Sequence, residues 1–350
     1  MTHCFSRRSF LKGSAAAAAA LTSPLLPADA AFSETENGLF SPVSVLCQTQ
    51  YGPVKGREGE NGQLCWYGIP YGAALTGESR WTAPQEPARW LTVRDCTSPA
   101  PAAYQYTTFP LGTEDCLTLD IYSSAEAKKR PVLVYLHGSA ATGSSLELPG
   151  SELVRDAGCV FVALNYRLGL FGWNCLPSLT SGSDAAGNFA LLDIARALDW
   201  VRDNIASFGG DPQNITVLGF AAGGRDGMAL LASPLFVGRF QKAISISGGM
   251  TCADENTSAE TLAAALAPLA VQDGKALTEA AARRWLLTED PAVRSWLCGV
   301  DAARLAPLMA NAGLRMSVFP HLYADGITLP EGGYPAAPYS EIPTLLLTGA

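Results

Sequence analysis

The sequence contains few of the residues on which metal and nucleic-acid sites depend. Only three of its 350 residues are histidines, and acidic residues exceed basic ones to give a net charge of −8. Its nine cysteines include no C-x-x-C pair. We therefore expect no zinc site, no other cofactor and no nucleic-acid partner. No apolar run reaches the roughly 20 residues that cross a bilayer, so the mature chain is expected to lack a membrane span.

The N-terminal segment has the composition of an export signal. Arg7 and Arg8 precede an alanine-rich apolar run at 15–21, and small residues follow at 28–30. This order predicts a twin-arginine signal over residues 1–30, which is cleaved on export. The mature chain, 31–350, is then periplasmic or secreted.

The cysteine count predicts disulfides. Removal of Cys4 with the signal leaves eight cysteines in an oxidising compartment. Proximity along the chain makes Cys65–Cys96 and Cys252–Cys298 the first candidate pairs.

Apolar runs without clean alternation predict strands that are covered on both faces. They lie at 117–122, 131–137, 159–165, 214–220, 242–247 and 342–348. The segment 187–210 has apolar residues at three- and four-residue steps and ends in two glycines, which predicts an amphipathic helix. Strands alternating with helices indicate an α/β fold with a parallel sheet. An N-terminal hairpin is expected over 43–72, a long surface loop over 81–110 and a helical insertion over about 255–315.

The stretch GFAAGGRDG at 219–227 has the glycine spacing of a nucleophile elbow. In such a strand-to-helix corner, glycines two residues either side of a central residue leave room for its strained backbone. Gly219 and Gly223 occupy these positions, but the central residue is Ala221. A methyl side chain cannot attack a carbonyl, so no base can activate this position.

Five further stretches surround this corner. They are TEDCLTLDIY (113–122), PVLVYLHG (131–138), LNYRLGLFGW (164–173), GNFALLDIARALDWVRDNIASFGGDPQNITVLG (187–219) and SPLFVGRFQKAISISGGM (233–250). Together they resemble the type-B carboxylesterase family, which includes the cholinesterases, from about residue 38 to residue 350. The resemblance implies an α/β-hydrolase fold with a mostly parallel central sheet, helices on both faces and a helical insertion. In active members it implies hydrolysis of carboxylic esters by a Ser-His-Glu triad.

The resemblance also assigns roles to positions of this chain. The family's G-E-S-A-G elbow matches 219–223, with Phe220 in place of the glutamate and Ala221 in place of the serine. Its H-G-G-G oxyanion loop matches 137–140, so the oxyanion donors fall on Ser139, Ala140 and Ala222, and we expect the Ala222 amide to be retained. His137 corresponds to a residue that supports this loop. Two structural ion pairs are implied, Arg80–Glu114 and Arg167–Asp193.

The remaining members of the triad have no counterpart in this chain. In the family the acid follows the strand that resembles 342–348, and the histidine comes later, so both would lie beyond Ala350. His321 falls in a segment that resembles a structural one and is not expected to be catalytic. Cys116 matches a disulfide cysteine whose partner position is Ala103, so that bridge is expected to be absent.

Three interpretations remain open. The chain is an exported carboxylesterase-family protein that is catalytically inactive, a non-catalytic module that binds an ester-like ligand or a protein, or a gene fragment or engineered variant. The other features have simpler explanations: we expect Arg225 and Asp226 to be a solvated or capping pair. The tryptophans at 66, 81, 90 and 173 are expected to pack in the core or against loops, in preference to lining an acyl pocket.

Overall fold

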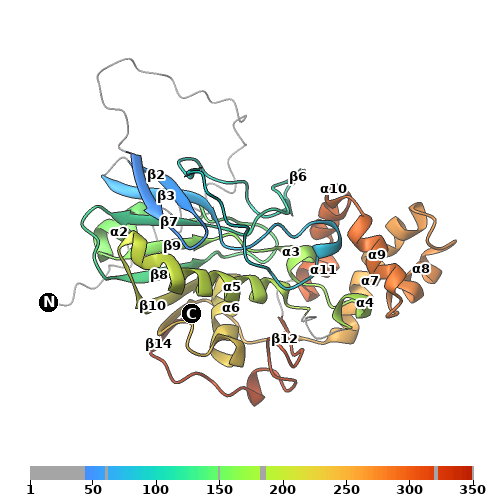
Figure 1. The fold of residues 1–350 in the computed structure, drawn as a ribbon. Helices are drawn as coiled ribbons and strands as arrows, with labels where there is room; N and C mark the ends of the chain where they lie inside the picture. Colours follow the sequence, from blue (N-terminus) through green and yellow to red (C-terminus); the bar gives the residue numbers. More distant parts are fainter. Residues whose placement is uncertain (1–43, 60–61, 149, 182–186, 319–321, 349–350) are drawn as a thin grey trace.

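The computed structural model describes residues 44–59, 62–148, 150–181, 187–318 and 322–348. A ten-stranded mixed sheet runs through it (Figure 1). Its antiparallel part is formed by β1 (Ser44–Gln48), β2 (Pro53–Glu58), β3 (Gln63–Pro70) and β7 (Thr118–Ser124), with β4 (Arg94–Asp95) beside β2. Its parallel part follows in the order β9 (Val160–Leu164), β8 (Arg130–Leu136), β10 (Gly210–Phe220), β11 (Lys242–Ile246) and β14 (Thr344–Leu347).

The apolar runs form the strands that the sequence predicts. Residues Val160–Leu164 of β9 are all buried, because the strand lies inside the sheet with side chains packed on both faces. The N-terminal hairpin is formed by β2 and β3, but a further strand, β1, precedes it. The segment 81–110 is mostly irregular, with the short strands β4, β5 (Gln105–Tyr106) and β6 (Pro110–Leu111).

Helices cover the two faces of the sheet unequally. On one face, α5 (Phe189–Asn204) and α6 (Ala222–Ala232) pack in the main core, with η2 (Ile205–Phe208) continuing α5. The expected helix 187–210 ends there because Gly209 adopts a left-handed conformation with φ 84°. On the other face, α2 (Gly150–Ala157) packs against β3, β7 and β9 in a second, smaller core.

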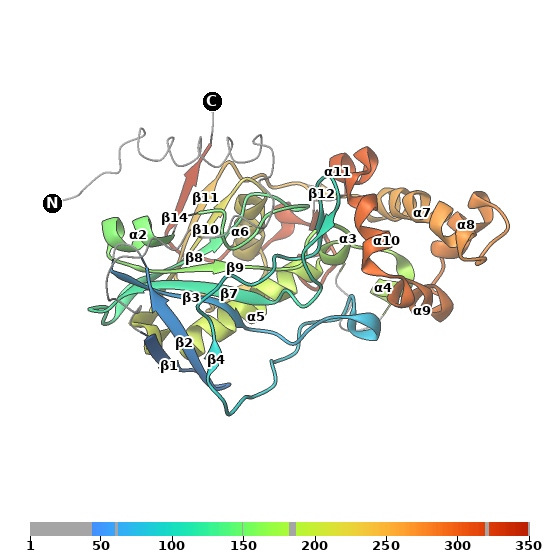
Figure 2. The same cartoon turned by 90° about the horizontal axis from the view of Figure 1, so that it is seen from above.

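The segment for which we expect helices lies at one end of the sheet (Figures 1 and 2). It contains α7 (Glu255–Gln272), α8 (Glu279–Leu286), α9 (Pro291–Gly299), α10 (Ala302–Leu305), η4 (Ala306–Ala310) and α11 (Ala312–Ser317). The remaining short elements are η1 (Gly77–Ser79), α3 (Gly169–Gly172), α4 (Pro177–Thr180), η3 (Pro234–Phe236), η5 (Tyr334–Ala336) and the pair β12 (Cys252–Ala253) and β13 (Leu322–Tyr323). Among the helices so described, none combines the length and apolarity needed to cross a membrane.

Candidate functional site

The strand β10 turns into the helix α6 through one residue, Ala221. Its backbone has φ 49° and ψ −109°, a conformation that side-chain-bearing residues rarely adopt. Strain of this kind costs about 1–3 kcal/mol and persists only where the surroundings impose it. Here the Ala221 N–H donates to the Ile246 carbonyl at 2.8 Å, and the Ala221 carbonyl accepts from the Arg225 N–H at 2.9 Å. The geometry of an elbow is therefore retained around a methyl group.

Close backbone contacts explain the two predicted elbow glycines. A Cβ atom on Gly219 would lie 2.0 Å from the Gly223 carbonyl oxygen, and one on Gly223 would lie 2.1 Å from the Leu136 carbonyl oxygen. A third glycine, Gly248, is constrained in the same way and was not predicted from the sequence. A Cβ on Gly248 would lie 2.4 Å from the Gly224 carbonyl carbon. The only local signal for it is the Gly248-Gly249 pair that follows β11.

One of the three expected oxyanion donors, the Ala222 N–H, is already hydrogen-bonded. The Ala222 N–H donates to the Gly138 carbonyl oxygen at 3.3 Å. Ser139 uses its hydroxyl to accept from the N–H groups of Ala141 (3.3 Å) and Thr142 (3.1 Å). The amide that we expected to remain available is thus retained, but it is already hydrogen-bonded. Ala140 is buried, and its carbonyl accepts from the Gly169 N–H at 2.7 Å.

His137 lies beneath this loop and is 1% exposed. Its ring stacks on Tyr166 with centroids 4.4 Å apart and an interplanar angle of 3°. Burial lowers the pKa of the imidazole to about 4, against the opposing effect of the backbone carbonyls of Ser139 and His137. Gly143, at φ 127°, approaches so closely that a Cβ would lie 2.7 Å from Nδ1 of the His137 ring. This neutral, packed ring supports the loop, and His321 lies outside the described residues.

Glu147 and Phe220 flank the loop and were not singled out as site residues from the sequence. The Glu147 carboxylate accepts from the Gly138 N–H at 3.0 Å and from the Tyr135 hydroxyl at 2.7 Å. Phe220, 38% exposed, lies against Gly138, since a Cβ there would be 2.8 Å from the Phe220 ring. An apolar ring therefore stands beside Ala221, where the family motif has a carboxylate.

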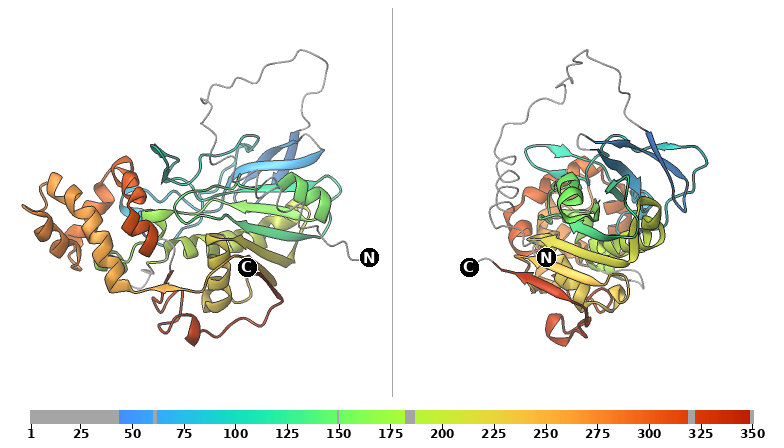
Figure 3. Two further views of the ribbon diagram at one scale, coloured as in Figure 1. Left: turned by 180° about the vertical axis from the view of Figure 1, so that it is seen from behind. Right: turned by 90° about the vertical axis from the view of Figure 1, so that its left-hand side faces the viewer.

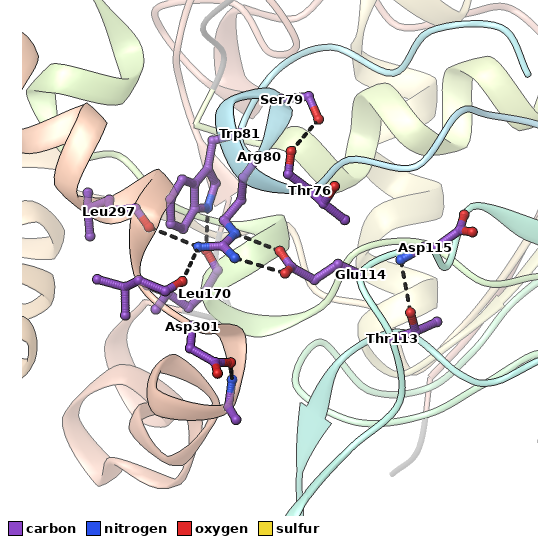
Figure 4. Close-up of polar contacts among 12 residues, drawn as sticks. Thr76, Ser79, Arg80, Trp81, Thr113, Glu114, Asp115, Leu170, Leu297 and Asp301 are labelled. Atoms are coloured by element: carbon purple, nitrogen blue, oxygen red, sulfur yellow. Dashed lines mark hydrogen bonds and ion pairs between the residues drawn. The ribbon is translucent and has the colours of Figure 1, made fainter.

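The Arg80–Glu114 ion pair joins the 76–114 segment to the helices at the end of the sheet (Figure 4). Arg80 donates to both Glu114 oxygens at 2.6 and 2.8 Å, and to the carbonyls of Leu297 and Val300 at 2.8 and 2.9 Å. Beside it, the Trp81 indole donates to the Leu170 carbonyl at 2.8 Å. The hydrogen bonds to Glu114, Leu297 and Val300 satisfy the Arg80 guanidinium, which is almost entirely buried.

The second implied ion pair, Arg167–Asp193, lies in the main core. Two guanidinium nitrogens of Arg167 donate to the Asp193 oxygens at 2.7 and 2.8 Å, and the Arg167 N–H adds a bond of 3.1 Å. This bidentate contact fixes the segment after β9 to helix α5.

Our expectation that Arg225 and Asp226 form a solvated or capping pair is wrong, since both are buried and the N-cap of α6, Ala221, has no side-chain cap bond. They are 3% and 0% exposed, because α6 is enclosed between the sheet and the rest of the core. Arg225 donates to Asp226 Oδ1 at 2.6 and 3.0 Å, and its guanidinium lies 5.1 Å from the Trp173 ring centroid. The polar and glycine-rich sequence around Arg225 and Asp226 did not indicate that they are buried. Trp66, Trp81 and Trp173 are buried core residues, as expected, and Trp90 is partly buried against the main core.

The expected disulfides are not formed among the described residues, where all eight cysteines are free. Cys65 belongs to the smaller core beneath α2, whereas Cys96 belongs to the main core, so the two thiols face opposite sides of the sheet. Cys252 is exposed in β12, whereas Cys298 is buried in α9. Nearness along the chain did not correspond to nearness in the fold. The described residues also contain no group of histidine, cysteine and acidic side chains suited to a metal ion.

A shallow, wide-open cavity of about 470 Å³ is lined in part by the Arg80–Glu114 pair. Its walls come from the 76–77, 104 and 112–114 segments and from the junction of α9 with α10 at 298–302. Tyr104 lies close to two acids here: burial, then the charges of Asp301 and Glu114, raise the pKa of its hydroxyl.

Comparisons with known proteins agree with this geometry. A twin-arginine translocation signal matches residues 4–24, so the chain is exported by that pathway to the periplasm or beyond. The para-nitrobenzyl esterase of Bacillus subtilis is 42% identical over 242 residues, which are 66% of this chain and 49% of that protein. The fumonisin B1 esterase of Sphingopyxis macrogoltabida is 35% identical over 254 residues, 67% of this chain and 46% of that protein. The chain thus spans about half the length of these relatives.

Solved structures give the same result for the fold. A thermophilic PNB esterase superposes with a TM-score of 0.71 at 34% identity, over 86% of this chain and 62% of that one. A Geobacillus stearothermophilus carboxylesterase superposes with a TM-score of 0.68 at 32% identity, over 81% and 56%. The expected α/β-hydrolase fold is confirmed. The model of the carboxylesterase family matches residues 43–279, more than half of the sequence, and the chain therefore belongs to the carboxylesterase family.

Proposed function

We propose that this chain is an exported carboxylesterase-family protein without esterase activity. The observation that supports the proposal most directly is Ala221 at the elbow, where an active member has its nucleophilic serine. Loss of a triad serine typically lowers turnover by about 10⁶-fold. Ala221 carries no oxygen or sulfur atom with which to form an acyl-enzyme.

The surroundings of Ala221 support the same conclusion. Residual catalysis in a triad mutant comes from the oxyanion hole and substrate binding. In this chain the Ala222 amide is hydrogen-bonded to the Gly138 carbonyl. A developing oxyanion would have to displace that carbonyl from the Ala222 amide. In addition, Ser139 and Ala140 stand where the family's loop has two of its three glycines. No described residue near Ala221 provides an exposed histidine as a base.

Hydrolysis of a short-chain nitrophenyl ester by the exported chain tests the proposal. We expect turnover equal to the buffer rate and no covalent adduct with a serine-reactive phosphonate by intact-protein mass spectrometry. An active carboxylesterase assayed in parallel serves as the positive control. Ester turnover comparable to that control, and abolished by the phosphonate, would show that the proposal is wrong.

The cavity lined in part by the Arg80–Glu114 pair favours a second candidate function, the binding of a small ligand. Its lining offers the hydroxyls of Thr76, Thr113 and Tyr104 and the exposed carboxylate of Asp301, whereas both Glu114 oxygens already accept from Arg80. The one cation in the lining, Arg80, already donates to four acceptors. Because hydrogen-bond acceptors predominate, the cavity suits a small hydroxylated amine better than an anion.

Calorimetric titration with glucosamine, with glucose as the neutral counterpart, tests this binding role. We expect glucosamine to bind more tightly than glucose, and Asp301→Asn to remove the difference because it removes the exposed carboxylate. Exposed Asp156, on α2, provides the control substitution Asp156→Asn. Equal or undetectable binding of both sugars by the wild-type chain would exclude the amine site.

A further inference from the structure

Six cysteines of the exported chain are buried, and none of them is bonded to another cysteine in the part of the chain that the structure describes. Each has an exposed fraction of 6% or less, and they are Cys65, Cys96, Cys116, Cys159, Cys175 and Cys298. The twin-arginine signal directs them into a compartment that oxidises accessible thiols. Six thiols persist there only if an oxidant cannot reach them.

The buried thiols are distributed over separate parts of the fold. Cys65 lies in the smaller core beneath α2, whereas Cys96, Cys116, Cys175 and Cys298 lie in the main core. Within the main core, the four come from the segment after β4, the segment before β7, the segment after α3 and helix α9. Figure 3 shows the blue strands, which include β3 with Cys65, and the orange helices, which include α9 with Cys298, at opposite ends of the molecule. Packing thus keeps these thiols apart.

Burial also removes the reactive form of the thiol. The Cys175 S–H donates to the Glu255 carbonyl at 3.5 Å, and the Cys159 S–H donates to the Leu153 carbonyl at 3.7 Å, bonds that a thiolate cannot make. Burial raises the pKa of Cys175 to about 12 and that of Cys159 to about 11. The thiolate is the form that attacks a disulfide. The folded chain therefore withholds both the access and the nucleophile.

An unfolded chain lacks this protection, because each thiol then has an ordinary pKa of about 8.5. A cysteine thiolate attacks oxidised glutathione to form a mixed disulfide and release one glutathione thiolate. A second cysteine thiolate attacks the mixed disulfide and releases the other glutathione. Two cysteines are oxidised, one glutathione disulfide is reduced, and the two protons pass to the released glutathione. A bridge such as Cys65–Cys96 would tie together residues that the fold places in two different cores.

We propose that the exported protein keeps these six cysteines as thiols, and that it reaches its fold only from the reduced chain. The six thiols must then be enclosed before the chain meets an oxidant. Bridged forms cannot close the two cores, so an oxidant acts on the folding of this chain and leaves the folded state unchanged. This behaviour does not depend on whether the chain cleaves esters.

Thiol labelling of the exported protein tests the first part of the proposal. The native protein is treated with N-ethylmaleimide, unfolded in urea and treated with an isotopically heavy form of the same reagent, and each cysteine is read by peptide mass spectrometry. We expect at least tenfold more heavy than light label at all six positions. Leu277→Cys provides the accessible control, because Leu277 is 97% exposed, and the new thiol should take the light label. Bridged peptides among the six, or light label at them, would overturn the proposal.

Refolding tests the second part. The reduced chain is unfolded in urea and diluted into buffer that contains either dithiothreitol or oxidised glutathione. We expect circular dichroism and a cooperative unfolding transition to return with dithiothreitol, and a yield of native chain at least tenfold lower with oxidised glutathione. Oxidised glutathione added after refolding should leave the yield unchanged. Equal yields in the two buffers, or no native chain from the reduced one, would contradict the proposal.

The double variant Cys47→Ser and Cys252→Ser is the matched control for refolding. It removes the two cysteines that are not buried, so every remaining bridge must involve the six. We expect the same difference between the two buffers as in the wild-type chain. Loss of the difference would assign the bridging to Cys47 and Cys252, and the second part of the proposal would be wrong.

Discussion

The Ala222 N–H donates to the Gly138 carbonyl oxygen at 3.3 Å, which joins the first turn of α6 to the loop after β8. In an active hydrolase of this architecture, the amide after the nucleophile stabilises the oxyanion. Here the same amide is used to hold the loop in place. The hydrogen bond gives this amide a structural role in the described residues.

Restoring the serine alone should not restore activity. In Ala221→Ser the described residues would offer the hydroxyl no exposed histidine as a base, and the Ala222 amide would still be bonded to Gly138. We expect turnover of a nitrophenyl ester within twofold of the wild-type background and no phosphonate adduct at position 221 by peptide mapping. A rate gain of 10³ or more would mean that the triad partners are supplied within this chain.

The backbone strain at Ala221 should be measurable as a change in the free energy of unfolding when the residue is replaced by glycine. Ala221→Gly relieves a backbone cost of about 1–3 kcal/mol and adds about 1 kcal/mol of unfolded-state entropy. We therefore expect the free energy of unfolding in urea to rise by about 1 kcal/mol. Ala280→Gly, at an exposed position of α8, should instead lower it by about 1 kcal/mol. Equal losses in both variants would show that Ala221 is not strained.

Two glycines of α6 should respond oppositely to alanine. Gly223→Ala puts a methyl 2.1 Å from the Leu136 carbonyl oxygen, whereas Gly227→Ala meets nothing within 4 Å. We expect the first to lower the free energy of unfolding by more than about 3 kcal/mol or to prevent folding. The second should raise it by about 0.5–1 kcal/mol because alanine favours the helix. Thermal unfolding of the pair gives the comparison, and similar effects at both positions would contradict the elbow geometry.

Breaking the Arg80–Glu114 pair from one side should be costly. Glu114→Ala leaves a buried guanidinium without its carboxylate, and we expect a loss of about 3–5 kcal/mol in the free energy of unfolding. The exposed pair Arg155–Asp156 provides the control, since Asp156→Ala should change stability by less than about 0.5 kcal/mol. A small effect of Glu114→Ala would mean that water reaches Arg80 in the folded chain.

His137 should make stability depend on pH. Its folded pKa of about 4 lies below its ordinary value of 6.5, so the unfolded chain binds the proton more readily. This contribution is fully present above pH 6.5 and is lost as the pH falls toward 4, by at most about 3 kcal/mol. His137→Phe keeps a ring against Tyr166 and should flatten the unfolding free energy across this interval. An unchanged pH slope in that variant would assign the dependence to other groups.

Local sequence signals were sufficient for the elements that have their own run of apolar residues or their own glycine spacing. The apolar runs predicted β7 to β11 and β14, and the glycine spacing at 219–223 predicted the corner itself. Local signals failed where the outcome depends on packing between distant segments. Arg225 and Asp226 resemble a solvated pair in the chain, and only the enclosure of α6 makes them buried. Cys65 and Cys96 are close in sequence, but the sheet separates their thiols into two cores.

The carbonyl oxygens of Leu136 and Gly223 constrain which residues fit at the corner between β10 and α6, whether or not that corner has a catalytic role. Because they leave no room for a side chain at 223 or 219, selection for folding alone would keep glycine at both positions. The residue between them has a strained backbone at φ 49°, but the closest contacts of the two glycines do not involve its side chain. A lineage that has stopped cleaving esters would therefore keep the corner around position 221 unchanged while the reactive group at 221 itself was lost.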